Sequence, residues 1–200
     1  KRLWNKKKFK APYKGKPKLE KRLDANLKLI DNFVSQGFKK NQIFITGRSC
    51  GGWMTMMLLA RYQNIVAGGI SFVPECYGRL TKNYKVKKVG VEEALKKFKK
   101  KDGPGPADMR KMQIDEIIKS KNLPVLIFTH PKDPFGGLLS DWVEKAPGVE
   151  RIVVSEDNKV NGKSCKVWGE GIKNFHDIDR ADCFEYYNST ILNFINSKLN

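Results

Sequence analysis

The stretch QIFITGRSCGGWMTMMLLARY, residues 42–62, decides the fold of this chain. Its first part, 42–46, is rich in β-branched and aromatic residues and predicts a short strand. Residues 47–52 form a turn bracketed by glycines, and the apolar run over 53–62 is long enough for a buried helix. The sequence therefore predicts a strand, a sharp turn and a helix in immediate succession.

Further apolar runs place this unit within a larger sheet. Runs at 65–73, 124–129 and 150–155 predict buried strands, and the apolar faces over 17–36 and 180–199 predict amphipathic helices. Continuous apolar strands separated by helices are typical of a mostly parallel sheet with helices on both faces. We therefore assign the chain to the α/β class.

A long connection, residues 75–122, separates the second and third predicted strands. It contains helix-like pieces at 91–100 and 107–119, joined by the sequence GPGP. Connections of this length usually have structure of their own and often a binding role. We predict a cap or lid insertion here, with a surface excursion as the alternative, and take Tyr77 and Tyr84 as candidate substrate contacts.

The turn matches a motif with a chemical role. Gly47, Ser49 and Gly51 fit G-x-S-x-G, the nucleophile elbow, in which a serine on a strained turn exposes its hydroxyl above a sheet. The two glycines are expected where the strand and helix backbones pass too close for a Cβ. Ser49 is therefore the candidate nucleophile, the alternative being a small residue in a tight turn. The side chain of Cys50 is expected to pack in the core.

A serine nucleophile needs an acid and a histidine, in the chain order Ser, acid, His. Asp133 follows the third predicted strand by four residues, and Asp141 is the reserve candidate. The chain has two histidines, and His176 lies just ahead of the closing helix, whereas His130 precedes the candidate acid. A turn aspartate and an exposed loop histidine are the alternatives. We predict Ser49, Asp133 and His176 as the catalytic set.

The residues GRSCGGWMT, 47–55, resemble the elbow of the prolyl oligopeptidase family, in which G-x-S-x-G-G is followed by an aromatic residue and Met-Thr. They also resemble dienelactone-hydrolase-like esterases, which share the α/β-hydrolase fold. The likeness extends over 17–76 and 123–198. The chain departs from these families in a Thr-His pair where they usually have His-Gly, and in a longer interval between the acid and the histidine.

The resemblance implies a serine hydrolase that needs no metal or other cofactor. Ser49 would attack an acyl carbon, His176 would transfer its proton, and Asp133 would hold the imidazole. The backbone N–H of Cys50 would supply one oxyanion donor, and Arg48 is a candidate substrate contact. The implied substrate is a small acyl compound, in first place a carboxylic ester, with an oligopeptidase activity as the alternative.

The elbow comes early for this fold. Several strands ought to precede the helix at 17–36, whereas sixteen residues do. We therefore expect this chain to be the C-terminal part of a longer hydrolase domain. Its N-terminal strands, and the loop that carries a second oxyanion donor, are expected to be missing or truncated.

No apolar run approaches the ~18 residues of a membrane span. The four cysteines lack the spacing of a zinc site. A disulfide between Cys165 and Cys183 is the pairing considered for them. The sequence indicates neither the compartment nor the oligomeric state.

The charge balance is strongly basic. Against 21 Asp and Glu the chain has 39 Lys and Arg, a net charge of +18, and residues 1–40 alone carry +11. This N-terminal arm, with Trp4, Phe9 and Tyr13, leaves open a non-catalytic hydrolase-fold module that binds polyanions. Lysine dominance and the lack of a nucleic-acid motif disfavour nucleic acid as a partner. The lysine run at 96–101 fits a solvated helix face.

Overall fold

A computed structural model describes residues 18–154, 159–160, 163–164, 175–179 and 184–199. The chain divides into two compact units, Lys1–Lys39 and Lys40–Asn200. The first contains α2 (Lys18–Ser35), which confirms the amphipathic helix expected there. The candidate bridge Cys165–Cys183 and the aromatic residues of the N-terminal arm lie outside the described residues.

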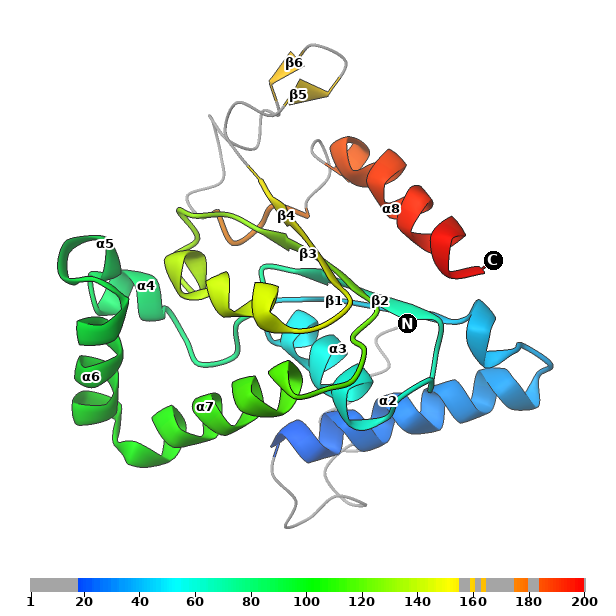
Figure 1. Cartoon of the computed structure of the whole chain (residues 1–200), viewed down its shortest axis with the longest axis horizontal. Helices are drawn as coiled ribbons and strands as arrows, with labels where there is room; N and C mark the ends of the chain where they lie inside the picture. The colour runs from blue at the N-terminus through cyan, green and yellow to red at the C-terminus, as the bar shows by residue number, and fades with distance from the viewer. Residues whose placement is uncertain (1–17, 155–158, 161–162, 165–174, 180–183, 200) are drawn as a thin grey trace, which may run out of the picture. The chain divides into compact units, whose positions relative to one another are not determined.

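The second unit is built on a parallel sheet (Figure 1). Its strand order is β1-β2-β3-β4, and every neighbouring pair is parallel. The strands are β1 (Phe44–Arg48), β2 (Gly68–Phe72), β3 (Val125–Thr129) and β4 (Val149–Val153). The two central strands are buried along their whole length, as their continuous apolar sequences require. All four predicted strands are confirmed.

Side-chain alternation along β2 assigns one helix to each face of the sheet. A Cβ on Gly69 would meet Thr55 and Leu59 of α3 (Cys50–Arg61), whereas a Cβ on Gly68 would meet Phe194 of α8 (Phe184–Leu199). Ile70 and Phe72 share a core with Phe194, Phe128 and Tyr187 on the α8 side. The sheet is therefore covered on both faces, as expected for this class.

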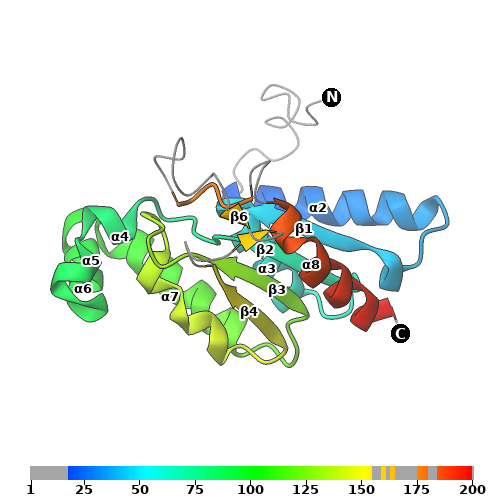
Figure 2. The ribbon, with the colours of Figure 1, turned by 90° about the horizontal axis from the view of Figure 1, so that it is seen from above.

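The connection over 75–122 is helical. It contains α4 (Leu80–Asn83), α5 (Val86–Val89), α6 (Val91–Asp102) and α7 (Pro104–Ile118). The GPGP sequence was expected to be a linker, but Gly103 alone makes the break, at φ 87°, and Pro104 begins α7. Leu80, Tyr84, Phe98 and their neighbours form a small separate core. Both views place α4–α6 together at one side of the sheet (Figures 1 and 2).

The remaining elements are short. They are the 3₁₀ helices η2 (Lys40–Gln42), η3 (Gly137–Leu139) and η4 (Asp141–Lys145), and the antiparallel pair β5 (Lys159–Val160) and β6 (Lys163–Ser164). No helix in the described parts of the chain combines the length and the apolar character that crossing a bilayer requires.

Candidate active site

Ser49 occupies a strained turn between a strand and a helix. Its backbone has φ 56° and ψ −125°, and it lies between Arg48, the last residue of β1, and Cys50, the first residue of α3. The Ser49 N–H donates to the Phe72 carbonyl at 2.9 Å, and the Ser49 carbonyl accepts the N–H of Trp53 at 3.0 Å. Because L-residues rarely adopt this conformation, both neighbours must hold it in place. This is the geometry of a nucleophile elbow.

The tight backbone approach around this turn involves a different pair of glycines from the one expected. A Cβ on Gly47 would lie 2.3 Å from the carbonyl carbon of Gly51, so Gly47 is required. A Cβ on Gly51 would meet nothing within 4 Å, whereas one on Gly52 would lie 2.5 Å from Ser71 Oγ. The steric reason given for Gly51 is therefore wrong, and the close packing of the helix belongs to Gly47 and Gly52.

These clearances predict opposite effects of two matched substitutions. Gly47→Ala forces backbone against backbone and is expected to lower the free energy of unfolding by about 2 kcal/mol or more. Gly51→Ala adds a methyl group in open space on α3 and is expected to be neutral or stabilising by up to about 1 kcal/mol. Denaturant unfolding followed by circular dichroism measures both. Equal losses in the two variants would contradict the geometry.

Asp133 and His176 are brought together from two distant parts of the chain. His176 Nδ1 lies 2.9 Å from Asp133 Oδ1, and both side chains are buried. The Asp133 carboxylate also accepts the N–H of Phe135 at 3.0 Å and of Gly136 at 3.1 Å. The Phe135 ring stacks on the imidazole with centroids 4.0 Å apart. The backbone of its own turn thus fixes the Asp133 carboxylate, and the carboxylate fixes the orientation of the His176 ring. Nε2 is then the ring nitrogen that can take a proton from a hydroxyl.

The reserve acid and the second histidine have other surroundings. Asp141 lies at the surface and pairs with Arg151 at 2.8 Å. His130 is buried, accepts the Lys132 N–H on Nδ1 at 3.0 Å, and stacks on Phe175 with centroids 4.4 Å apart. Of the two candidate acids, Asp133 is therefore the one that contacts His176. His130 packs against Phe175, the residue before His176.

An ion pair ties the elbow to the histidine segment. Arg48, the residue before Ser49, binds Asp177, the residue after His176, and its Nε lies 3.6 Å from Asp179 Oδ2. Arg48 was expected to contact substrate, but its guanidinium is engaged by these two carboxylates instead. The pair brings the segment around Ser49 next to the segment around His176.

The Ser49 hydroxyl itself contacts the turn after β2. Its Oγ lies 3.4 Å from the Glu75 carbonyl oxygen, and within the described residues it makes no hydrogen bond to His176. The distance is at the limit of a hydrogen bond, so the contact is weak. Rotation about χ1 would exchange it for another partner.

Glu75 organises this turn from within, although it is not among the residues predicted from the sequence. Its side chain is fully buried, Oε1 accepts the N–H groups of Cys76 and Tyr77 at 2.8 and 2.9 Å, and Oε2 pairs with Arg110 of α7 at 3.2 Å. Burial raises the pKa of the Glu75 carboxyl, and Arg110 and the two N–H groups oppose that rise. An acid directly after a buried strand, at the edge where α/β proteins bind ligands, was the available signal.

A disulfide joins the elbow to the same turn. Cys50 is bonded to Cys76, and both residues are half-buried, so the expectation that the Cys50 side chain packs in the core is wrong. The bond fixes the residue whose N–H is the candidate oxyanion donor. The N–H groups of Cys76 and Tyr77 already donate to Glu75, so in this arrangement neither can serve as the second donor.

The two candidate lid tyrosines differ in their surroundings. Tyr77 donates to Gln113 at 2.9 Å and packs edge-on against Trp53, and burial raises its pKa to about 12. Tyr84 lies instead in the small core of the helical segment, where it binds Asp102 and packs against Phe98. We therefore keep Tyr77, and not Tyr84, as a residue near the Ser49 site.

Among the described residues, no three His, Cys, Asp or Glu side chains gather as a set of metal ligands. No protein-family model and no curated protein sequence matches the chain.

Comparison with solved structures shows the fold. An esterase of the fungus Rhizomucor miehei superimposes on 95% of this chain with a TM-score of 0.53 at 16% identity. SOBER1 of Arabidopsis thaliana (TM-score 0.48, 16% identity, 91% of this chain) and a predicted CIB-like hydrolase of Thermoplasma acidophilum (0.47, 17%, 87%) are also similar. The chain spans 63%, 65% and 60% of these three structures, respectively.

The parallel sheet, the elbow and the likeness to the Rhizomucor miehei structure together define an α/β-hydrolase fold. At this identity the likeness establishes the fold. The narrower resemblance to prolyl oligopeptidases and dienelactone hydrolases stays a prediction.

Proposed function

We propose that this chain carries the catalytic residues of a serine hydrolase that cleaves carboxylic esters. The observation that carries the proposal is the 2.9 Å contact between His176 Nδ1 and Asp133 Oδ1. The ion pair between Arg48 and Asp177 holds the His176 segment next to the turn that carries Ser49, whose φ is 56°. A buried carboxylate on Nδ1 is what a general-base histidine requires for its orientation and tautomer.

In the proposed reaction, Ser49 Oγ turns from the Glu75 carbonyl to His176 Nε2 and attacks the ester carbonyl carbon. His176 takes the hydroxyl proton, and the tetrahedral oxyanion accepts a hydrogen bond from the Cys50 N–H. Collapse releases the alkoxide, which takes the proton from His176 and leaves an acyl-serine. Water then attacks this ester by the same route, giving the carboxylic acid and free Ser49.

The likeness to a structure described as a fungal esterase supports an ester as the substrate. A serine oligopeptidase uses the same groups, so the leaving group has to be tested directly. Turnover of p-nitrophenyl esters against aminoacyl-p-nitroanilides separates the two activities. The proposed chemistry is complete without a metal or cofactor.

A fluorophosphonate probe tests the proposal, because its phosphorus is attacked only by an activated serine, with loss of fluoride. We expect one labelled site on the wild-type chain, no label on Ser49→Ala, and full label on Ser197→Ala, an exposed serine of α8. Gel fluorescence and peptide mass spectrometry provide the measurement. An unlabelled wild type would overturn the enzyme assignment, and a label that survives in Ser49→Ala would overturn the site.

A further inference from the structure

Positive charge is concentrated on one part of the second unit, residues 79–102, which we call the α4–α6 patch. It carries ten basic and three acidic side chains, a net charge of +7. This equals the whole net charge of residues 41–200, so the remainder of that span is balanced. All ten basic side chains are exposed. The charge excess is therefore a local property of the helical segment.

Acidic side chains in the described part of the chain compensate only a minority of these charges. Ion pairs in the patch join Lys96 to Glu92 at 2.9 Å, Lys97 to Glu93 at 3.5 Å, and Lys99 to Asp108 at 2.9 Å. Six other lysines form no ion pair with any described residue: Lys82, Lys85, Lys87, Lys88, Lys100 and Lys101. A cluster of uncompensated ammonium groups attracts anions over about 8 Å at physiological ionic strength.

The patch contains a hollow that is lined by three of these six lysines and by the ion-paired Lys97. The hollow, of about 560 Å³, is lined by four lysines together with one polar and two apolar residues: Lys85, Lys97, Lys100, Lys101, Asn83, Tyr84 and Val89. Its walls thus offer several ammonium donors beside an apolar surface. This combination suits an anionic group attached to a larger apolar body.

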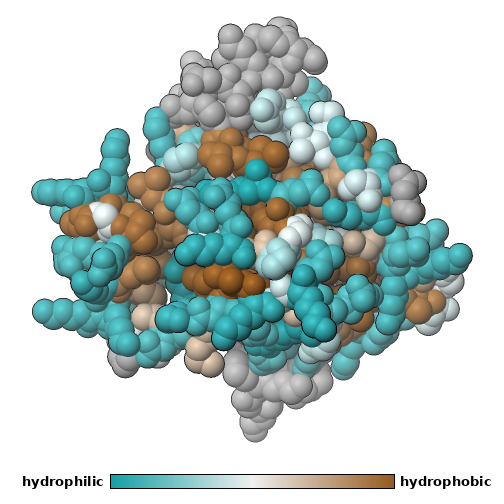
Figure 3. Space-filling view, viewed as in Figure 1, coloured by the Kyte–Doolittle hydropathy of each residue, from teal (hydrophilic) through white to brown (hydrophobic). Residues whose placement is uncertain are grey.

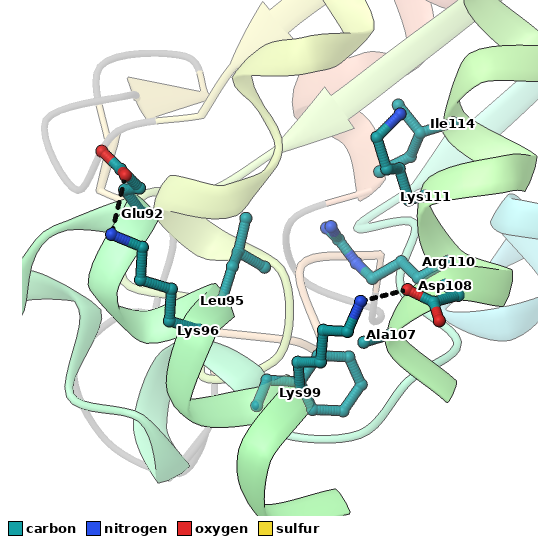
Figure 4. Close-up of a pocket in the computed structure, with 10 residues that line it drawn as sticks. Glu92, Leu95, Lys96, Lys99, Ala107, Asp108, Arg110, Lys111 and Ile114 are labelled. Atoms are coloured by element: carbon teal, nitrogen blue, oxygen red, sulfur yellow. Dashed lines mark hydrogen bonds and ion pairs between the residues drawn. The ribbon is translucent and has the colours of Figure 1, made fainter. Parts of the chain in front are cut away.

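Apolar surface continues on another side of the same helix. Leu95 and Phe98 of α6 and Ala107 and Ile114 of α7 line a groove of about 390 Å³, with Lys99 paired across it to Asp108 (Figure 4). Apolar surface over α4–α6 is framed by hydrophilic side chains (Figure 3). Cationic and apolar surface are therefore interleaved along α6.

This chemistry favours a lipid surface over nucleic acid. The two aromatic rings of the patch, Tyr84 and Phe98, are only 6% and 3% exposed, so no platform for base stacking exists there. Nine of the ten basic residues are lysines, and the arginine, Arg79, lies over the Phe135 ring. A bilayer offers both a negative surface and an apolar interior. We propose that the α4–α6 patch docks on bilayers that contain anionic phospholipid, with headgroup phosphates at the lysine-lined hollow.

Vesicle binding by the full chain tests this proposal, independently of any hydrolase activity. We compare sedimentation with vesicles of phosphatidylcholine alone and of equal parts phosphatidylcholine and phosphatidylglycerol. An exposed lysine near an anionic bilayer strengthens partitioning by roughly fivefold. Reversing Lys85, Lys100 and Lys101, the lysines of the hollow that form no ion pair with described residues, to Glu is therefore expected to weaken binding to the anionic vesicles by about 100-fold or more, without change on phosphatidylcholine alone.

A matched variant removes the effect of net charge. Lys119, Lys121 and Lys145 are exposed, lie outside the patch and form no ion pair with described residues. Reversing these three to Glu changes the net charge equally, and we expect at least about ten times tighter binding than for the patch variant. Equal losses in both variants, or none in either, would overturn the proposal. So would patch-dependent binding to an oligonucleotide that is tighter than binding to the vesicles.

Discussion

His176→Gln is expected to lower kcat for p-nitrophenyl ester hydrolysis by roughly 10⁶-fold, since removing one member of a Ser-His unit costs about as much as removing all. Glutamine fills a similar volume and still donates to Asp133, but it cannot take the proton of Ser49 in the transition state. The Phe135 stacking is kept in part, so the fold is expected to persist. Steady-state kinetics and circular dichroism of the same sample separate lost chemistry from lost structure.

His130→Gln is the matched control, because the chain contains two histidines. It is buried and packs against Phe175, and the reaction proposed above does not use it. We expect less than about a tenfold loss of kcat for this variant. A large loss in His130→Gln with little loss in His176→Gln would reverse the assignment of the base.

Local patterns were sufficient to predict the sheet and the elbow. Each strand overlaps an apolar run whose length and β-branched content indicate it without reference to the rest of the chain. The sequence G-x-S-x-G places Ser49 because the turn it requires is defined within five residues. Asp133 and His176 followed from chain order and from the scarcity of histidine, and their 2.9 Å contact agrees with that choice.

Such local patterns did not predict the contacts between residues that are distant in the sequence. Arg48 and Asp177 are 129 residues apart, Glu75 and Arg110 are 35 apart, and Cys50 and Cys76 are 26 apart. Nothing in the residues around any of them indicates the partner, because each pairing depends on how helices and loops pack over the sheet. The Gly51 clearance has the same origin, since it depends on where the backbone of β1 passes α3.

Tyr84 illustrates a further limit. An aromatic residue in a long connection is equally suited to line a substrate site or to form a core within the connection. The decision depends on α6, because Phe98 and Ala94 give Tyr84 apolar neighbours and Asp102 gives its hydroxyl a partner. Sequence alone does not show that residues 80–98 can bury a core of their own.

Asp133→Asn is expected to lower kcat for ester hydrolysis by about 10⁴-fold while leaving the fold intact. Both carboxylate oxygens accept hydrogen bonds, Oδ1 from His176 and the Phe135 N–H, and Oδ2 from the Gly136 N–H. An amide has one acceptor oxygen and cannot satisfy all three donors. If its NH₂ faces His176, it stabilises the tautomer that carries the proton on Nε2, which cannot accept the Ser49 proton.

Either orientation of the new amide in the Asp133→Asn variant sets its NH₂ against a backbone N–H. The NH₂ meets the Phe135 N–H when it faces His176 and the Gly136 N–H when it faces away, two donors in a buried site, which costs about 1–3 kcal/mol. In both orientations the negative charge that stabilises the imidazolium in the transition state is lost, so kcat falls while KM is little changed. Asp141→Asn is the control, because its surface carboxylate binds Arg151 and does not approach the histidine. If Asp141→Asn rather than Asp133→Asn lost activity, the acid of the proposed triad would be reassigned.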